Sequence, residues 1–111
     1  MNYSQRMPWR DHPLSRASAS QSVDPRDVWA ALERGEATLL DLRTKLERRQ
    51  HGAPPGAVRV SLLRHTLHPA GPPAVYLCQH AVRSKLTLRN GAAEVAGGFA
   101  RWRDEGLPVE P

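Results

Sequence analysis

Cysteine is nearly absent from the sequence, because Cys78 is the one cysteine among 111 residues. A single thiol excludes an internal disulfide and a zinc site built from several thiolates. No apolar run approaches the roughly 18–20 residues that a transmembrane helix needs, and the N-terminus lacks the apolar segment of a secretory signal. We therefore expect a protein of the reducing cytoplasm, with no membrane partner, no metal and no other cofactor.

Acidic residues are fewer than basic ones, and the formal net charge is +5. Of the 16 basic residues only Lys45 and Lys85 are lysine, and the arginines are spread along the whole chain. Such a charge helps to attract small anions and acidic partners. No basic patch interleaved with aromatic residues and no zinc knuckle accompanies it, so we expect no nucleic-acid binding.

The length and the apolar fraction of 40% suit one small domain with one core. Residues 1–21 contain Pro8, Pro13 and several serines but no apolar periodicity, which predicts a flexible tail. The arginines of this tail resemble a weak targeting peptide, but the two prolines would interrupt the amphipathic helix that such a peptide needs. The folded domain is expected to span residues 22–111.

The clearest helix signal begins at Asp24, a good N-cap, with Pro25 at the first helical position. Gly35 marks its end. The next pattern, 37–43, is a nearly continuous apolar run that predicts a central parallel strand buried on both faces. Weaker patterns follow, and they predict a solvated helical turn at 44–50, an edge strand at 58–60, one or two helical turns at 61–67, a strand at 92–96 and a final helix at 99–105.

Alternating strand and helix signals of this kind predict an α/β sandwich with a mostly parallel sheet. Asp41 and Arg43 fall at the C-terminal edge of the first predicted strand, where they could support a catalytic loop or pair with a nearby helix end. His65 and His68 have a spacing that would suit a metal if a third ligand were close. Pro69 after them favours a flexible exit from the helix instead.

The chain is organised around the stretch 74–84. The short apolar run 74–77 follows a Gly-Pro-Pro turn and predicts a buried strand that carries Cys78 to its C-terminal end. Open α/β sheets place their ligand crevice at that end. A polar loop follows and meets a helical pattern at Arg83 and Ser84, so backbone N–H groups and a helix dipole would favour a thiolate and hold an anionic sulfur species. The alternative is an unreactive buried cysteine.

Four segments resemble, in the same order, the landmarks of single-domain rhodaneses. They are 39–43 (LLDLR), 51–57 (HGAPPGA), 78–84 (CQHAVRS), and 97–102 (GGFARW) followed by 106–109 (GLPV). The resemblance covers roughly residues 23–111. It implies a rhodanese-like three-layer α/β sandwich with a small, mostly parallel sheet flanked by short helices.

The same resemblance implies a sulfurtransferase. Cys78 would take sulfane sulfur from thiosulfate or a persulfide donor, become a persulfide, and pass the sulfur to a thiol or cyanide. Asp41 and Arg43 would support the loop, and Arg83 would recruit the anionic donor. A sulfur-relay protein is a possible partner, and the oligomeric state stays open. The substrate-binding loop would consist of Gln79, His80, Ala81, Val82, Arg83 and Ser84.

Two departures from the family pattern lead to further expectations. Ala81 stands where the family usually has glycine, and a positive φ there would strain an alanine. Only 12 residues separate Ser84 from Gly97, so we expect a truncated helix after the loop and a missing or irregular strand before Gly97. Both departures favour a second hypothesis, an interaction module or a redox or sulfur sensor that has lost turnover.

A third hypothesis comes from the cysteine-dependent phosphatases, whose loop has the pattern C-x5-R. Here Arg83 lies five positions after Cys78, which gives C-x4-R and a loop one residue shorter. A tighter loop suits a sulfur atom attached to Cys78 better than a tetrahedral phosphate beside it. Because catalysis depends on where the donors point, the sequence disfavours a phosphatase.

Overall fold

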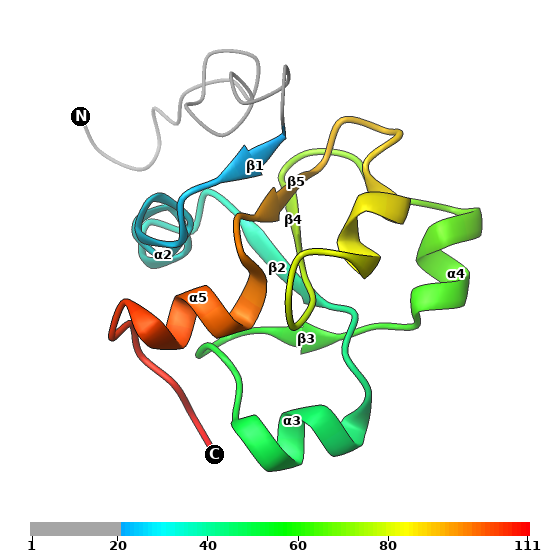
Figure 1. Ribbon diagram of the computed structural model, residues 1–111. Helices are drawn as coiled ribbons and strands as arrows, with labels where there is room; N and C mark the ends of the chain where they lie inside the picture. The colour runs from blue at the N-terminus through cyan, green and yellow to red at the C-terminus, as the bar shows by residue number, and fades with distance from the viewer. Residues whose placement is uncertain (1–20) are drawn as a thin grey trace.

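The structure is a computed structural model that describes residues 21–111 (Figure 1). The predicted tail, apart from Gln21, lies outside the described residues. Gln21 is part of the domain, because its side-chain amide donates hydrogen bonds to the carbonyl oxygens of Leu88 and Ala92 at 3.0 and 2.7 Å. The elements in chain order are β1 (Ser22–Val23), α2 (Pro25–Glu33), β2 (Thr38–Asp41), α3 (Lys45–His51), β3 (Val58–Arg59), α4 (Leu62–Leu67), β4 (Ala74–Leu77), the 3₁₀ helix η4 (Arg83–Thr87), β5 (Ala93–Val95) and α5 (Gly98–Asp104).

The five strands form one sheet in the order β1-β5-β4-β2-β3, and each neighbouring pair is parallel. Helices α2 and α5 cover one face of this sheet, while α4 and η4 cover the other (Figure 1). The predicted α/β sandwich of three layers is therefore confirmed, and the sheet is entirely parallel. All four residues of β4 are buried, as expected for a central strand with helices on both faces.

The face under α2 and α5 holds the larger apolar core. Trp102 and Phe99 of α5 are completely buried there, and the Trp29 ring meets the Trp102 ring edge to face at a centroid distance of 6.0 Å. Aromatic side chains of this size contribute much of a small domain's buried area. The buried members of this core are Val23, Val28, Ala31, Leu39, Val75, Leu77, Ala93, Val95, Phe99 and Trp102.

The face under α4 and η4 holds a smaller core, in which Tyr76 is the largest buried side chain. Its hydroxyl accepts a hydrogen bond from the Ala70 N–H at 2.8 Å and lies 2.5 Å from His65 Nδ1. Burial lowers the pKa of His65 and raises that of Tyr76. The other buried members are Leu42, Ala74, Cys78 and Ala92. Because side chains alternate along β4, Cys78 shares this face with Tyr76.

The expectation that the strand before Gly97 is missing or irregular was wrong. Strand β5 is neither missing nor irregular, since it pairs in parallel with both β1 and β4. The shortening falls on the helix instead, which is reduced to the five-residue η4. Pairing on both sides explains the result, because ladder hydrogen bonds and burial outweigh the weak strand propensity of an alanine-rich segment.

Several other expectations are confirmed. Asp24 caps α2 by accepting a hydrogen bond from the Arg26 N–H, and Gly35 follows the end of the helix in a left-handed conformation. Strand β3 lies at the edge of the sheet, as its pattern predicted. The two-residue strand β1 was not predicted. Among the residues that the structure describes, no helix is long and apolar enough to cross a membrane.

Candidate active site

Cys78 follows β4 directly and lies at the base of a tight loop. Its side chain is only 1% exposed. The backbone N–H of Val82 donates a hydrogen bond to the sulfur at 3.1 Å, and the Ser84 hydroxyl oxygen lies 3.6 Å from the same atom. The loop therefore wraps around the sulfur, as the sequence predicted, and directs a backbone donor at it.

Ala81 has a φ of 58°, in the left-handed region that the sequence analysis considered. Alanine pays a steric penalty in this conformation because its Cβ approaches the following carbonyl. The turn at Ala81 brings the Val82 N–H toward Cys78. The strained backbone is therefore part of the turn that directs this hydrogen-bond donor at the sulfur. The side chain of Val82 itself points outward and is 71% exposed.

The start of α5 holds the other side of the loop. The N–H groups of Phe99 and Ala100 donate to the carbonyl oxygens of Cys78 and Gln79 at 2.9 and 3.0 Å. Gly98 permits this approach, because a Cβ on it would lie 2.5 Å from the Cys78 carbonyl oxygen. These contacts engage the carbonyl oxygens of Cys78 and Gln79, while the Val82 N–H is directed at the sulfur.

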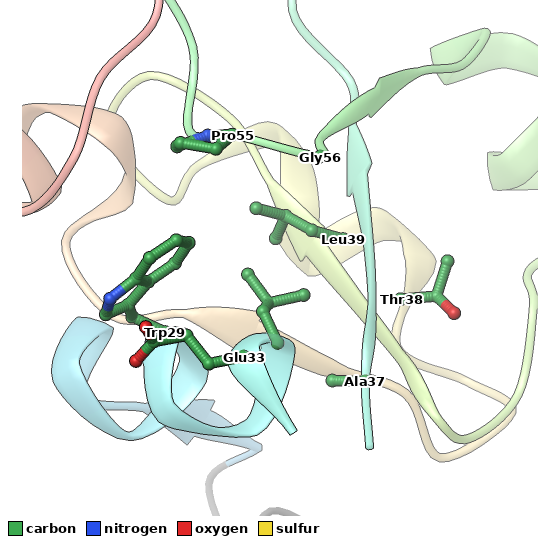
Figure 2. A pocket seen from close by; sticks show the side chains of 8 residues that line it. Trp29, Glu33, Ala37, Thr38, Leu39, Pro55 and Gly56 are labelled. Atoms are coloured by element: carbon green, nitrogen blue, oxygen red, sulfur yellow. The ribbon is translucent and has the colours of Figure 1, made fainter. Parts of the chain in front are cut away.

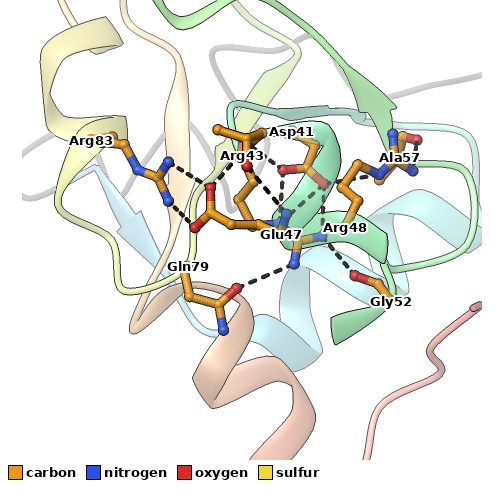
Figure 3. Close-up of polar contacts among 9 residues, drawn as sticks. Asp41, Arg43, Glu47, Arg48, Gly52, Ala57, Gln79 and Arg83 are labelled. Carbon is orange, nitrogen blue, oxygen red and sulfur yellow. Dashed lines mark hydrogen bonds and ion pairs between the residues drawn. The ribbon is translucent and has the colours of Figure 1, made fainter. Parts of the chain in front are cut away.

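Asp41 and Arg43 form a completely buried ion pair behind the loop, with Arg43 Nη2 2.8 Å from Asp41 Oδ2 (Figure 3). Arg43 Nη1 also donates to Gln79 Oε1 at 3.2 Å, and Nη2 donates to the Gly52 carbonyl. The guanidinium carbon lies 4.2 Å from the centre of the Phe99 ring, in a cation–π position. Arg43 thus contacts the active loop directly, and Asp41 neutralises and orients it.

Arg83 is paired with Glu47 of α3 through two hydrogen bonds, at 2.8 and 2.6 Å (Figure 3). The bond from Arg83 lowers the pKa of Glu47 to about 2. The same bond, with a smaller contribution from Cys78, raises the pKa of Arg83. Glu47 was not among the predicted site residues, although the Thr-x-x-Glu capping box that Thr44 opens marks this position.

Glu94 of β5 is a second acidic residue that sequence reasoning missed. It is completely buried on the same face as Cys78 and accepts a hydrogen bond from Ser84 Oγ at 2.5 Å. Ser22 Oγ donates to its other oxygen at 2.7 Å, and the Lys85 ammonium pairs with that oxygen as well. The only sequence signal was an acid in the middle of an alanine-rich strand pattern.

The predicted site residues therefore come together. Asp41 and Arg43 lie behind the loop, Ser84 lies beside the sulfur, and Arg83 lies at the rim. His80 is exposed and contributes to a shallow pocket of about 360 Å³ beside the loop. Its other lining residues are His51, Gln79, Ala100, Arg103 and Asp104.

Two other pockets are remote from this chemistry. One lies between α2 and β2, where Trp29 and Leu39 face Pro55 across an apolar hollow (Figure 2). The other is lined in part by His65 of α4 and by His68, the C-cap residue that follows this helix. Within residues 21–111 no group of three or more metal-binding side chains is present, so the pair of histidines has no third ligand.

Comparison with known proteins identifies the fold. No protein-family model and no curated protein sequence matches the chain. Solved structures do match. A rhodanese-related protein from Thermoplasma volcanium superposes with a TM-score of 0.67 at 22% identity, covering 80% of this chain and 96% of that one. The chain has a rhodanese-like fold.

Two further structures match the chain, and their descriptions differ. The human single-domain sulfurtransferase TSTD1 has a TM-score of 0.62 at 21% identity, covering 77% of this chain and 96% of that one. A protein from Rhodopseudomonas palustris described as a possible tyrosine phosphatase has a TM-score of 0.67 at 23% identity, covering 87% and 91%. Because fold does not decide function, the site must carry the functional argument.

Proposed function

We propose that this rhodanese-like domain is a sulfurtransferase that carries sulfane sulfur on Cys78. The observation that supports the proposal is the environment of the thiol. Cys78 is the only cysteine, it directly follows the central strand β4, and its sulfur accepts a hydrogen bond from the Val82 N–H. Fixed N–H donors stabilise negative charge that develops on sulfur, and little energy is needed to reorient them because they already point at it.

The reaction with thiosulfate would proceed by displacement at the sulfane sulfur. The Cys78 thiolate attacks that sulfur, the S–S bond of thiosulfate breaks, and its electron pair leaves with sulfite. The product is the Cys78 persulfide anion. Cyanide or an acceptor thiolate then attacks the outer sulfur, and the electron pair of the broken S–S bond returns to Cys78 as a thiolate. Nucleophilic catalysis thus divides one transfer into two displacements.

The roles of the surrounding groups follow from their contacts. Arg83 would attract the anionic donor, although Glu47 already occupies two of its donor groups. Asp41 and Arg43 would keep Gln79 and the loop in place. A persulfide donor or a sulfur-relay protein remains within the same proposal, because the displacement step is identical for any sulfane sulfur.

A second candidate function is a sensor or interaction module that forms the persulfide but does not turn over. The strained Ala81 and the short η4 favour it. A phosphatase is disfavoured, because the short loop already closes on the sulfur through the Val82 N–H. That loop leaves less room for a phosphate than a loop one residue longer.

The experiment that tests the proposal compares Cys78→Ser with the wild type in sulfur transfer from thiosulfate to cyanide. We expect the serine variant to lose all transfer while melting within a few degrees of the wild type, since an alcohol cannot form a persulfide. Transfer by the serine variant near the wild-type rate would refute the covalent mechanism. Persulfide formation by the wild type without turnover would favour the sensor.

A further inference from the structure

The buried carboxylate of Glu94 has no part in the reaction as written above, yet it contacts the active loop. It lies on β5, beside Tyr76 of β4, on the face of the sheet that Cys78 shares. Among residues 21–111 its side-chain partners are Ser84, Lys85 and Ser22, and all of them are hydrogen-bond donors. A set of donors without an acceptor suits the ionised carboxylate.

Through its hydroxyl, Ser84 donates a hydrogen bond to Glu94 and accepts one from Cys78. Its hydroxyl donates to Glu94 Oε1 at 2.5 Å, so its single proton points away from Cys78. Its oxygen lone pairs therefore face the sulfur at 3.6 Å, where they accept a hydrogen bond from the protonated thiol. For a thiolate or a persulfide anion the same lone pairs are unfavourable, because two acceptors would face each other.

We propose that Glu94 is a positioning residue that holds Ser84 as a hydrogen-bond acceptor and so keeps Cys78 in its protonated resting form. The negative charge of Glu94, one hydroxyl away from the sulfur, acts in the same direction. To stabilise an anion on the sulfur, Ser84 must turn its proton away from Glu94 and toward Cys78. The carboxylate therefore opposes formation of the nucleophile.

Other groups around the sulfur act in the opposite direction. The Val82 N–H and the nearby Arg83 favour an anion on Cys78, and the Lys85 ammonium neutralises part of the charge on Glu94. The side chain of Lys85 is largely exposed, whereas Glu94 is completely buried. The protonation of Cys78 thus depends on the balance between the Val82 N–H and Arg83 on one side and the Glu94 carboxylate on the other.

The test follows the thiolate directly through its ultraviolet absorbance during a pH titration. Cys78 is the only cysteine, so the difference from a Cys78→Ser blank reports this one sulfur. Glu94→Gln should give about tenfold more thiolate on the rising part of the curve, the effect of moving that curve by one pH unit to lower pH. Gln can still accept and donate where Glu94 accepted, which preserves the packing.

The matched control is Ser22→Ala, which removes a hydroxyl donor from the other oxygen of Glu94 and leaves the bond to Ser84 in place. We expect its titration curve to coincide with that of the wild type. Ser84→Ala should raise the thiolate fraction like Glu94→Gln, and adding Glu94→Gln to it should change the curve much less than in the wild type. This variant also tests the proposal if Glu94→Gln does not fold.

An unchanged curve in a folded Glu94→Gln variant, or a curve moved to higher pH, would overturn the proposal. So would an equal effect of Glu94→Gln in the presence and absence of the Ser84 hydroxyl. The inference rests on the proposed function only in taking Cys78 as the reacting group. Because the titration needs no sulfur donor, it can succeed or fail independently of sulfur transfer.

Discussion

The two faces of the sheet are built differently. Under α2 and α5 the buried side chains are large and apolar, with Trp102 and Phe99 at the centre. Under α4 and η4 the buried set is smaller, and polar groups such as Glu94 and Ser84 take the place of further apolar volume. The Cys78 side chain lies on this second face, while α5 of the first face holds the backbone of its loop. Stability and reactivity are thus concentrated on opposite sides of one thin sheet.

This division follows from the shortening of the chain after the loop. Five residues of 3₁₀ helix cover less of the sheet than a longer α-helix would, and Leu86 of η4 stays 52% exposed. The large apolar core on the opposite face compensates. A functional site can therefore carry a strained alanine and a buried carboxylate, because the rest of the domain supplies the folding free energy.

The largest expected effect is on the apolar face. Trp102→Ala should lower the free energy of unfolding by about 3–5 kcal/mol, because it removes a completely buried indole and leaves a cavity. Urea denaturation followed by circular dichroism would measure the loss. A loss below about 1 kcal/mol would contradict the view that this face supplies most of the stability.

A smaller loss is expected from the opposite face. Tyr76→Phe keeps the ring but leaves the Ala70 N–H and His65 without the hydroxyl, and we expect a cost of about 1–3 kcal/mol. The same denaturation experiment measures it. Equal losses of unfolding free energy for Tyr76→Phe and Trp102→Ala would contradict our view that the face under α2 and α5 contributes more to stability.

The next effect concerns the strain in the loop. Because Ala81 has a positive φ, Ala81→Gly should stabilise the domain by about 1 kcal/mol and should also speed sulfur transfer. The matched control is Ala30→Gly within α2, which should instead destabilise by about 0.5–1 kcal/mol. If both substitutions destabilise, the loop is not strained in the way that its backbone indicates.

The smallest effect concerns the ion pair at the rim. The hydrogen bonds from Arg83 lower the pKa of Glu47 from its ordinary value of 4.5 to about 2. Its pairing therefore stabilises the fold fully above about pH 5, and this contribution is lost as the pH falls toward 2. Thermal melts of wild type and Glu47→Gln should differ at neutral pH and converge at low pH. A difference that grows on acidification would contradict this assignment.

Much of the architecture was predictable because its signals are local. Asp24, Pro25 and Gly35 bounded α2 correctly, and the apolar run before Cys78 identified the buried strand β4. The central strand buried on both faces was predicted for 37–43, but β4 holds the central place and β2 leaves Thr38 exposed. Strand β5 was misjudged because its stability comes from pairing with β1 and β4, which no local pattern encodes.

The site was predictable in part for the same reason. The loop residues follow one another in the chain, so Cys78 and Ser84 could be placed together in advance. Glu47 and Glu94 approach the loop from α3 and β5, far away in sequence. Their contacts depend on topology, and only the capping box at Thr44 hinted at one of them.

The most direct measurement of the central claim is the intact mass of the protein after incubation with thiosulfate. We predict a gain of one sulfur atom, located on Cys78 by peptide mapping, removed by cyanide and absent from Cys78→Ser. That result would show that the reactive group is the cysteine on the face of the sheet under α4 and η4. A folded wild-type protein that gains no sulfur under these conditions would contradict the account.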